Sequence, residues 1–498
     1  MGRFKELDHK QSQFIILDFE EQLMEGTFEY VLYFIFERGL VNIEPFIKKY
    51  LNDKNGRKAY HPSIMLKIIM LGYSRGVISS RKLARLCKEN ILFKVISCSS
   101  EPDFTTIADF VSGMHDEILS VFKDVLKVCD EFDLIGGEVF ALDGHKVSSN
   151  ASKEWSGTFN DLKKREEKCL ALAKNILEDH VKADKGEYKK NLKERADKYI
   201  KKVNKINEFL NSNSPKIGAS KTEIQSNITD NESARMMSSH GVIQGYTGEA
   251  MVDEKSQIII YAEAFGVANE NNLVQEMVKQ SNFTLESIKS RRGNLKGKIL
   301  LADNGNSSKD NLEFLDKLKI DAYIPDHEFR KRDKNFQSET FKKHKSKTPL
   351  YYPNEKFIYN KANDTYICPN GKLLQKQRID RSKTLEGYRY AAKEKDCSVC
   401  PLRETCLRKK NTKYRTIKVN IIKIGESTLY DKMKEKIDST EGKKMYSKRM
   451  GIVEPVFANI RAQKKLNYFT LRSKKKVNIQ WNLFSIIHNL EKLRSVFI

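Results

Sequence analysis

Residues 138–143, Glu-Val-Phe-Ala-Leu-Asp, decide the fold class of this chain. Four consecutive apolar residues lead straight into an aspartate, and such a short apolar run is typical of a strand that is buried on both faces. Residues 298–303, Lys-Ile-Leu-Leu-Ala-Asp, repeat the pattern. A helix is expected over about 308–318 and another strand over 321–325, and this order favours a right-handed parallel crossover. The sequence therefore predicts an α/β fold with a mixed sheet.

Two further segments lie between these strands. Residues 244–252 and 257–263 alternate polar and apolar residues and predict an antiparallel hairpin. Residues 155–213 contain no Pro, and Lys and Glu alternate in short blocks. This pattern predicts one or two long, solvated helices inserted in the domain. An arm that grips DNA and a simple spacer both explain such an insertion.

Asp143 and Asp303, which follow the two apolar runs, are the first candidates for catalysis. In open α/β sheets, binding sites form in the crevice beyond the carboxyl ends of the strands. A carboxylate there loses solvation unless it is paired or holds a cation. Two such carboxylates close together would repel each other unless a divalent metal lay between them, and Mg²⁺ prefers oxygen ligands. The pair is therefore a candidate site for metal-assisted cleavage of a phosphodiester.

Glu454 is the best candidate for the third acid that such a site needs. It lies in Val-Glu-Pro-Val-Phe, residues 453–457, within the most basic segment of the chain. Pro455 suits the first position of a helix, so we expect Glu454 at a helix N-terminus. There it could also simply complement the helix dipole. Glu441 and Glu491 are weaker candidates.

The positive charge of the chain is large and unevenly distributed. The 498 residues include 90 Lys and Arg against 66 Asp and Glu, a net charge of +24. Residues 441–498 contain 13 Lys and Arg against 3 Asp and Glu, and residues 327–350 contain 8 against 3. Such concentrated positive charge suits a surface that contacts phosphates. Nucleic acid is therefore the expected partner.

Composition excludes several other classes of protein. Hydrophobic residues make up 39% of the chain, which is enough for sizeable cores and excludes wholesale disorder. The chain has no apolar run long enough to span a membrane, and its first residues form no secretory signal. We therefore expect a soluble protein of the cytoplasm.

Residues 1–130 are expected to form a separate all-helical domain. Three short helices with tight turns are predicted, and the second has a basic face formed by Arg81, Lys82 and Arg85. This arrangement resembles a helix-turn-helix unit in which the basic face contacts DNA. An ordinary small helical bundle explains the pattern equally well.

Four cysteines, Cys368, Cys397, Cys400 and Cys406, fall close together in the sequence. In a chain without a secretory signal, such a cluster favours metal binding over disulfides. The pair Cys-Ser-Val-Cys with one cysteine before it and one after it fits a structural zinc site with four thiolates. Reduced cysteines without a metal, or an iron–sulfur cluster, are the alternatives.

Three motifs together resemble bacterial insertion-sequence transposases of the DDE class. They are residues 143–153, Asp-Gly-His-Lys-Val-Ser-Ser-Asn-Ala-Ser-Lys, residues 301–305, Leu-Ala-Asp-Asn-Gly, and residues 453–457. The most similar branch is the one called IS eleven-eighty-two, and the resemblance covers nearly the whole chain. Each motif alone is loose, whereas all three in this order are fairly specific.

The resemblance implies an RNase H-like core in which Asp143, Asp303 and Glu454 hold two Mg²⁺ or Mn²⁺ ions. The enzyme would cleave DNA at the ends of its own element and transfer the freed 3′-hydroxyl groups to target DNA. It would act as an oligomer that bridges two DNA ends, in the cytoplasm of a bacterium and in association with the nucleoid.

Related transposases also have a Tyr, Arg, Glu, Lys signature around the third acid. Tyr446, Arg449 and Glu454 resemble it, although four residues rather than three separate Arg449 from Glu454. Arg461 stands at the Lys position and could bind a phosphate in a bidentate manner. The resemblance thus implies DNA contacts by Tyr446, Arg449 and Arg461. His145 stands where the branch usually has Thr. Contact with DNA and a simple surface position both explain it, and we favour the surface position.

The resulting domain hypothesis has four parts: residues 1–130, the first part of the catalytic core at 131–325, a basic and Cys-rich insertion at 326–439, and the last part of the core at 440–498. Two other functions fit the same sequence. One is an RNase H-like nuclease without strand transfer, and the other is a non-catalytic, zinc-containing DNA-binding protein. An inactive, decayed copy is a third alternative.

Overall fold

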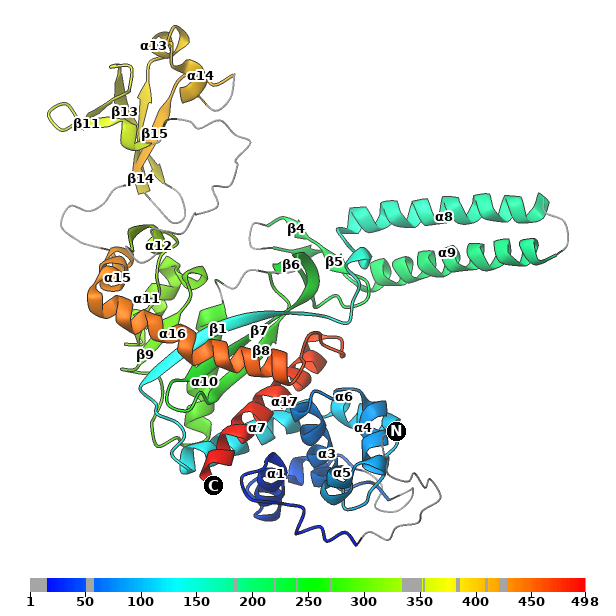
Figure 1. Cartoon of the computed structure of the whole chain (residues 1–498). Coiled ribbons are helices and arrows are strands. Elements are labelled where there is room, and N and C mark those ends of the chain that lie inside the picture. Colours follow the sequence, from blue (N-terminus) through cyan, green and yellow to red (C-terminus); the bar gives the residue numbers. More distant parts are fainter. Residues whose placement is uncertain are drawn as a thin grey trace, which may run out of the picture. The chain divides into compact units, whose positions relative to one another are not determined.

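The computed structural model divides the chain into two compact units, which are described separately (Figure 1). The first unit comprises Met1–Phe329 with Met433–Ile498, and the second comprises Arg330–Lys432. The basic run at 327–350 lies mostly outside the described residues. The structure describes residues 16–50, 58–182, 186–218, 221–238, 241–268, 271, 273–333, 352, 354–381, 386–407, 411–420 and 428–497.

The first unit is built on a six-stranded mixed sheet. Its strands are β1 (Val139–Ser148), β6 (Ala234–Ser238), β7 (Gly241–Asp253), β8 (Ile259–Phe265), β9 (Ile299–Ala302) and β10 (Asp321–Tyr323). β1 pairs in parallel with β9 and antiparallel with β7, and β9 pairs in parallel with β10. The other edge of β7 pairs with β8 and β6. The predicted α/β class, mixed sheet and antiparallel hairpin are therefore confirmed.

Several helices surround this sheet. α16 lies across β1 (Figure 1) and also contacts β7, β9 and β10, whereas α10 packs against β7 and β8. α11 connects β9 to β10, as the sequence predicts. The elements are α10 (Leu273–Ser287), η2 (Asn304–Asn306), α11 (Lys309–Lys317), α12 (Phe329–Arg332), α15 (Leu429–Asp438), α16 (Thr440–Ala458), η5 (Asn459–Gln463), α17 (Lys474–Leu493) and η6 (Arg494–Val496).

The N-terminal segment is helical, and it shares its core with the C-terminal helix. α17 packs against α7, α3, α6 and α1 as well as against β8, and it is buried along almost its whole length. No helix among the described residues combines the length and apolar character needed to cross a membrane. The helices are α1 (Phe28–Glu37), α2 (Glu44–Ile47), α3 (Pro62–Ser74), α4 (Ser80–Glu89), α5 (Ile91–Ile96), α6 (Phe104–Gly113) and α7 (His115–Glu131).

The expectation that a helix begins at Pro455 is wrong. α16 begins at Thr440, where the Ser439 hydroxyl accepts a hydrogen bond from the Gly442 N–H, and it continues through Pro455. Proline has no N–H, so the carbonyl of Gly451, one turn earlier, loses its helical donor. The Gln257 side-chain amide donates to that carbonyl instead, at 2.9 Å. This tertiary hydrogen bond compensates for the proline.

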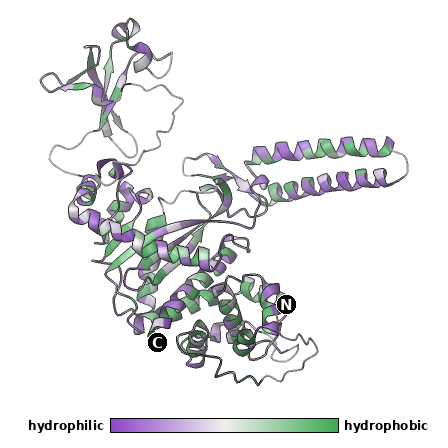
Figure 2. Cartoon of the chain, in the orientation of Figure 1, coloured by the Kyte–Doolittle hydropathy of each residue, from purple (hydrophilic) through white to green (hydrophobic). Residues whose placement is uncertain are grey.

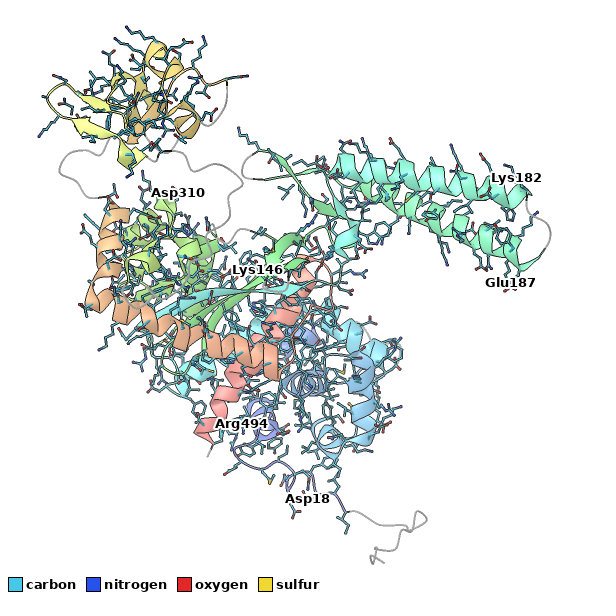
Figure 3. The ribbon with its side chains drawn as sticks, turned by 45° about the horizontal axis from the view of Figure 1, so that its top comes forward. Asp18, Lys146, Lys182, Glu187, Asp310 and Arg494 are labelled. Carbon is cyan, nitrogen blue, oxygen red and sulfur yellow. The ribbon has the colours of Figure 1, made fainter. Side chains whose placement is uncertain are left out.

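The insertion after β1 is a helical hairpin, as predicted, formed by α8 (Phe159–Lys182) and α9 (Glu187–Ser212). Lys182 and Glu187 mark the end of the hairpin that is farthest from the sheet (Figure 3). The exposed surface of the hairpin is mostly hydrophilic, with some exposed hydrophobic side chains on α8 (Figure 2). Buried Ala173, Ile176, Leu192 and Ala196 hold the two helices together. Short elements surround its base: η1 (Lys153–Trp155), β2 (Ser156–Gly157), β3 (Lys216–Ile217), β4 (Glu223–Ile224) and β5 (Ser226–Asn227).

The second unit is a five-stranded antiparallel sheet in the order β11-β12-β13-β14-β15. Its core consists of the buried residues Phe357, Leu374, Tyr390, Ala392 and Ile417. This unit falls within the segment 326–439 that the sequence analysis sets apart. Its elements are η4 (Asn354–Lys356), β11 (Ile358–Asn360), β12 (Thr365–Ile367), β13 (Leu373–Arg381), β14 (Glu386–Ala392), α13 (Glu394–Ser398), α14 (Arg403–Cys406) and β15 (Thr416–Asn420).

The buried His488 of α17 predicts that the first unit loses stability in acid. Its Nε2 atom lies 2.9 Å from the carbonyl oxygen of Gln257, and its Nδ1 atom lies 3.3 Å from the side-chain nitrogen of Asn459. Both contacts suit a neutral ring, and burial lowers the pKa of His488 to about 3. In the unfolded chain the ring is protonated below about pH 6.5. The contribution of neutral His488 to the stability of the folded unit is therefore complete above pH 6.5, and it is lost progressively as the pH falls to about 3.

We expect this group to lower the free energy of unfolding by about 1.4 kcal/mol for each pH unit below 6.5. Urea unfolding of the protein and of His488→Gln at several pH values would measure it. The difference between the two proteins isolates the histidine, because every other titrating group is common to both. Equal pH slopes for the two proteins would contradict the assignment.

Candidate active site

Asp143 and Asp303 lie side by side at the junction of β1 and β9. The last parallel pair between these strands is Leu142 with Ala302, so the two aspartates occupy the next positions on neighbouring strands. Adjacent strands are about 4.8 Å apart. The carboxylates therefore belong to one site, as the sequence analysis expects.

Asp143 differs from the prediction in one respect, because it does not end its strand. β1 continues to Ser148 and remains paired with β7 over this length. Only the parallel pairing with β9 ends at Leu142. Asp143 therefore lies inside a rigid strand, and this position fixes the backbone of the carboxylate better than a loop would.

The Asp143 carboxylate has one cationic partner. The Arg449 guanidinium of α16 lies 2.8 Å from it, and the two side chains are only 14% and 25% exposed. The Gly144 N–H also donates to Asp143 Oδ1 at 2.9 Å. Burial raises the pKa of Asp143, the Arg449 charge and the Gly144 N–H oppose this rise, and the nearby Asp303 adds to it. The site thus concentrates negative charge in a half-buried position.

Asp303 is held by the turn that follows β9. Its Oδ1 atom accepts hydrogen bonds from the Gly305 N–H at 2.7 Å and from the Asn306 side-chain amide at 3.3 Å. It also caps η2. These contacts fix one carboxylate oxygen and explain why the sequence Asp-Asn-Gly-Asn follows the strand.

The structure does not bring Glu454 into contact with the two aspartates. Glu454 is exposed on α16, and no contact between described residues joins it to Asp143 or Asp303. It lies five residues after Arg449, which is about 140° around the helix axis. The buried Val453 occupies the position nearer the sheet. With three residues between Arg449 and the acid, as in the related signature, the acid would stand at the position of Val453. The extra residue moves it to the exposed position 454.

The signature residues around Glu454 extend the site along α16. Tyr446 packs edge-on against Phe329, with ring centroids 5.5 Å apart, and Arg449 lies 5.9 Å from the Tyr446 ring centroid. Arg461 is exposed in the π-helical turn η5, and its charge contributes to lowering the pKa of His145, after the larger effect of burial.

His145 is not the surface residue that the sequence suggests. It is half-buried, and its ring centroid lies 6.0 Å from that of Phe457 of α16. His145 is two residues beyond Asp143, so both side chains lie on the face of β1 that α16 covers. The sequence gives no sign of this cover because Phe457 is distant along the chain.

The predicted basic face of α4 is exposed. Arg81, Lys82 and Arg85 are all accessible to solvent. Arg81 lies over the Phe104 ring, 4.9 Å from its centroid, and Arg85 forms an ion pair with Glu89 at 2.9 Å. Within the described part of the chain, the charge of Lys82 is available to a phosphate. Arg81 and Arg85 could exchange the Phe104 ring and Glu89, respectively, for a phosphate.

The four clustered cysteines of the second unit are reduced. Lys372 N–H donates to Cys368 Sγ at 3.3 Å, and the Asn370 amide donates to Cys400 Sγ at 3.5 Å. Burial raises the pKa of Cys406, and the other three thiols contribute to this shift. Nevertheless, within the described ranges no group of three or more His, Cys, Asp or Glu side chains is placed to hold a metal ion.

Two cavities that no motif in the sequence predicts lie at the base of the helical hairpin. Each has a volume of about 420 Å³, and Trp155 lines both. The only signal in the sequence is the Trp itself, because the rest of the lining comes from distant segments.

Two family models match separate parts of the chain. The model described as Transposase DDE domain matches residues 367–494, and the model described as Transposase domain (DUF772) matches residues 18–113. No curated protein and no solved structure matches the chain. Both models describe transposase domains, and together they support an insertion-sequence transposase of the DDE class, a class of DNA-cleaving enzymes. The first match includes Glu454 and the four cysteines, whereas Asp143 and Asp303 lie outside both.

Proposed function

We propose that this transposase cleaves the ends of its own insertion sequence and transfers the 3′-hydroxyl ends to target DNA, with Asp143, Asp303 and Glu454 as the catalytic acids. The observation that carries the proposal is the adjacency of Asp143 and Asp303 at the β1–β9 junction. Arg449 balances the charge of Asp143, so the second carboxylate, Asp303, leaves negative charge at this half-buried site that a further cation would balance. A divalent metal ion, of the kind that DNA-cleaving enzymes of this class use, would be that cation.

The core is proposed to be RNase H-like. Its support is the strand order β8-β7-β1-β9-β10, in which β1, β7 and β8 form an antiparallel meander and β9 and β10 continue the sheet in parallel with β1. Asp143 lies on the central strand β1, and Asp303 directly follows the neighbouring strand β9. The assignment to the IS eleven-eighty-two branch is also a proposal.

The oxygen ligands of Asp143 and Asp303 fit Mg²⁺ or Mn²⁺. When bound, two such ions activate the attacking hydroxyl and stabilise the leaving oxygen of an in-line displacement at phosphorus. The chain's own contribution is positional. The strand fixes Asp143, the Asp303 turn fixes the second carboxylate, and Arg449 favours the ionised form of Asp143.

Glu454 lies on the flank of α16 rather than on its sheet-facing side. Its support is its place in the sequence motif and its position between Arg449 and Arg461 on the same helix and turn. Arg461, Tyr446 and Arg449 would then contact the DNA strand that approaches the acids. The basic face of α4, with Arg81, Lys82 and Arg85, would contact the flanking duplex, and an oligomer would bridge two ends on the bacterial nucleoid.

A strand-transfer assay tests this function. The substrate is pre-cleaved end DNA with a free 3′-hydroxyl, together with target DNA and Mg²⁺ or Mn²⁺. We expect joined products. Hydrolysis without joined products would instead identify a nuclease, and DNA binding without either reaction would identify a non-catalytic protein.

We also propose that the four cysteines of the second unit hold one structural zinc ion. The support is that Cys406 lies near the other three thiols and that backbone and amide donors point to two of the sulfurs. Elemental analysis of the purified protein should find about one zinc per chain, as a four-thiolate site predicts. Cys397→Ser should remove it, whereas Cys98→Ser, at an exposed cysteine outside the cluster, should not. Absence of zinc from the unmodified protein would contradict the proposal.

A further inference from the structure

The two cavities at the base of the hairpin meet at Trp155. One cavity opens beside α8 and α9, and the other opens beside the loop that follows β1. A volume of about 420 Å³ is within the range of pockets that hold one small molecule. The residues that the argument uses are Arg165 and Lys202 in the first cavity, and Lys205, Arg472 and Tyr468 in the second.

Among the described residues that line the two cavities, cations outnumber acids in both: Arg165 and Lys202 against Glu154 in the first, and Lys205 and Arg472 with no acid in the second. The Lys205 ammonium lies 4.9 Å from the Trp155 ring centroid, and the Arg472 guanidinium donates to the Asn150 carbonyl at 2.8 Å. Arg165 donates to the Glu154 carbonyl oxygen rather than to a carboxylate. In the described part of the chain, no ion pair involves any of these cations. Their charges are therefore available to an anionic ligand.

Aromatic side chains accompany these charges. Trp155 is partly exposed, although its other atoms pack on the cluster of Leu162, Ile206 and Phe209. Tyr468 is 52% exposed and pairs through its backbone with Ser148, the last residue of β1. Exposed aromatic rings beside a row of cations are typical of sites that hold single-stranded nucleic acid, because bases stack on the rings while phosphates meet the cations.

The cavities lie on the continuation of the catalytic strand. β1 runs without interruption from Asp143 to Ser148, a rise of about 17 Å at 3.4 Å per residue. Ser149, the next residue, lines the second cavity, so this cavity begins about 17 Å along the chain direction of β1 from Asp143. The Arg461 charge acts on His145, which lies on this part of β1.

We propose that these two cavities form a binding site for an unpaired DNA strand that leads away from the cleavage site. This inference rests on the proposed function, since it places the strand by reference to Asp143. Trp155 and Tyr468 contact bases, and Arg165, Lys202, Lys205 and Arg472 contact phosphates. In this proposal the base of the hairpin α8–α9 binds DNA, so the hairpin is not merely a spacer.

Intrinsic fluorescence tests the proposal, because the chain has two tryptophans and the other one, Trp481, is fully buried. The probe is an oligothymidylate of about 12 nucleotides, within the range of single-strand sites, added to the full-length protein. We expect it to quench the emission of Trp155. Trp155→Phe should keep the fold and show no quenching of the remaining emission.

The phosphate contacts are tested in the same titration. The double variant Lys205→Ala/Arg472→Ala should bind the oligonucleotide about tenfold more weakly. The slope of the logarithm of the binding constant against the logarithm of the salt concentration should become less steep by about 1.4, or about 0.7 for each lost phosphate contact. Lys193→Ala, at an exposed lysine nearer the loop of the hairpin, is the matched control and should bind as the unmodified protein does.

Cleavage of end DNA, measured on the same preparation, separates this inference from the proposed function. A protein that cleaves end DNA, but whose fluorescence and titration do not respond to the oligonucleotide, overturns the single-strand site alone. Quenching that depends on Trp155 in a protein without cleavage supports the single-strand site and overturns the transposase mechanism. Quenching that persists in Trp155→Phe overturns the assignment to these cavities.

Discussion

Asp143→Asn should reduce cleavage of end DNA by at least about 10³-fold while leaving the affinity for that DNA nearly unchanged. The size of the loss follows from the role proposed for Asp143, because the carboxylate would hold the ion that stabilises charge at the reacting phosphate. Binding should persist because it depends on many separate phosphate contacts. Gel-based cleavage and fluorescence anisotropy, each with Mg²⁺, measure the two effects.

The control for this substitution must separate chemistry from folding. Asn keeps the shape of the side chain, but it leaves Arg449, which is 14% exposed, without its carboxylate partner. Urea unfolding should therefore accompany the assay, since an unpaired half-buried charge costs stability. Asp310→Asn in the first turn of α11 (Figure 3) is the matched control and should cleave normally. Full cleavage by Asp143→Asn would exclude Asp143 from catalysis.

Glu454→Gln in the same assay decides the third acid. A loss as large as that of Asp143→Asn would mean that α16 brings Glu454 to the site when DNA and metal are present. Normal cleavage would exclude Glu454 and leave the site with Asp143 and Asp303. The comparison is informative because the variant removes an exposed charge and should leave stability almost unchanged.

The central sheet could be predicted because its signals are local. The apolar runs before Asp143 and Asp303 identify the strands β1 and β9, and the strand–helix–strand order around α11 predicts the parallel pairing of β9 with β10. The amphipathic helices of the hairpin are predicted on the same basis. The adjacency of the two aspartates depends in addition on the parallel pairing of β1 with β9, which the structure shows.

Features that depend on distant partners could not be predicted. β1 extends through Gly-His-Lys-Val-Ser to Ser148 because β7 supplies hydrogen bonds there, and not because those residues favour a strand. α16 passes through Pro455 because Gln257, far away in sequence, satisfies the Gly451 carbonyl. The exposure of Glu454 follows from this uninterrupted helix. The sequence motif identifies the acid, but it cannot give the face of the helix on which the acid lies.

Trp481→Ala should lower the free energy of unfolding of the first unit by about 3–5 kcal/mol, the usual cost of truncating a buried aromatic residue. Trp481 of α17 is completely buried. Its ring lies parallel to that of Phe457 of α16, with centroids 6.4 Å apart, and its indole N–H donates to the Glu249 carbonyl at 3.1 Å. The substitution therefore leaves a cavity between α17, α16 and β7 and removes the hydrogen bond to the Glu249 carbonyl.

The two tryptophans offer a matched comparison for this prediction. Trp155→Ala removes a side chain of the same size from a partly exposed position, so it should cost clearly less, because part of that ring never left water. Guanidinium unfolding followed by circular dichroism measures both variants. Equal losses of unfolding free energy in the two variants would mean that the packing of Trp481 against α16 and β7 does not stabilise the first unit more than the partly exposed Trp155 does. If the prediction holds, Trp481→Ala should also weaken cleavage at temperatures well below its unfolding transition. Trp481 packs against Phe457 of α16, and Arg449 of the same helix is the partner of Asp143.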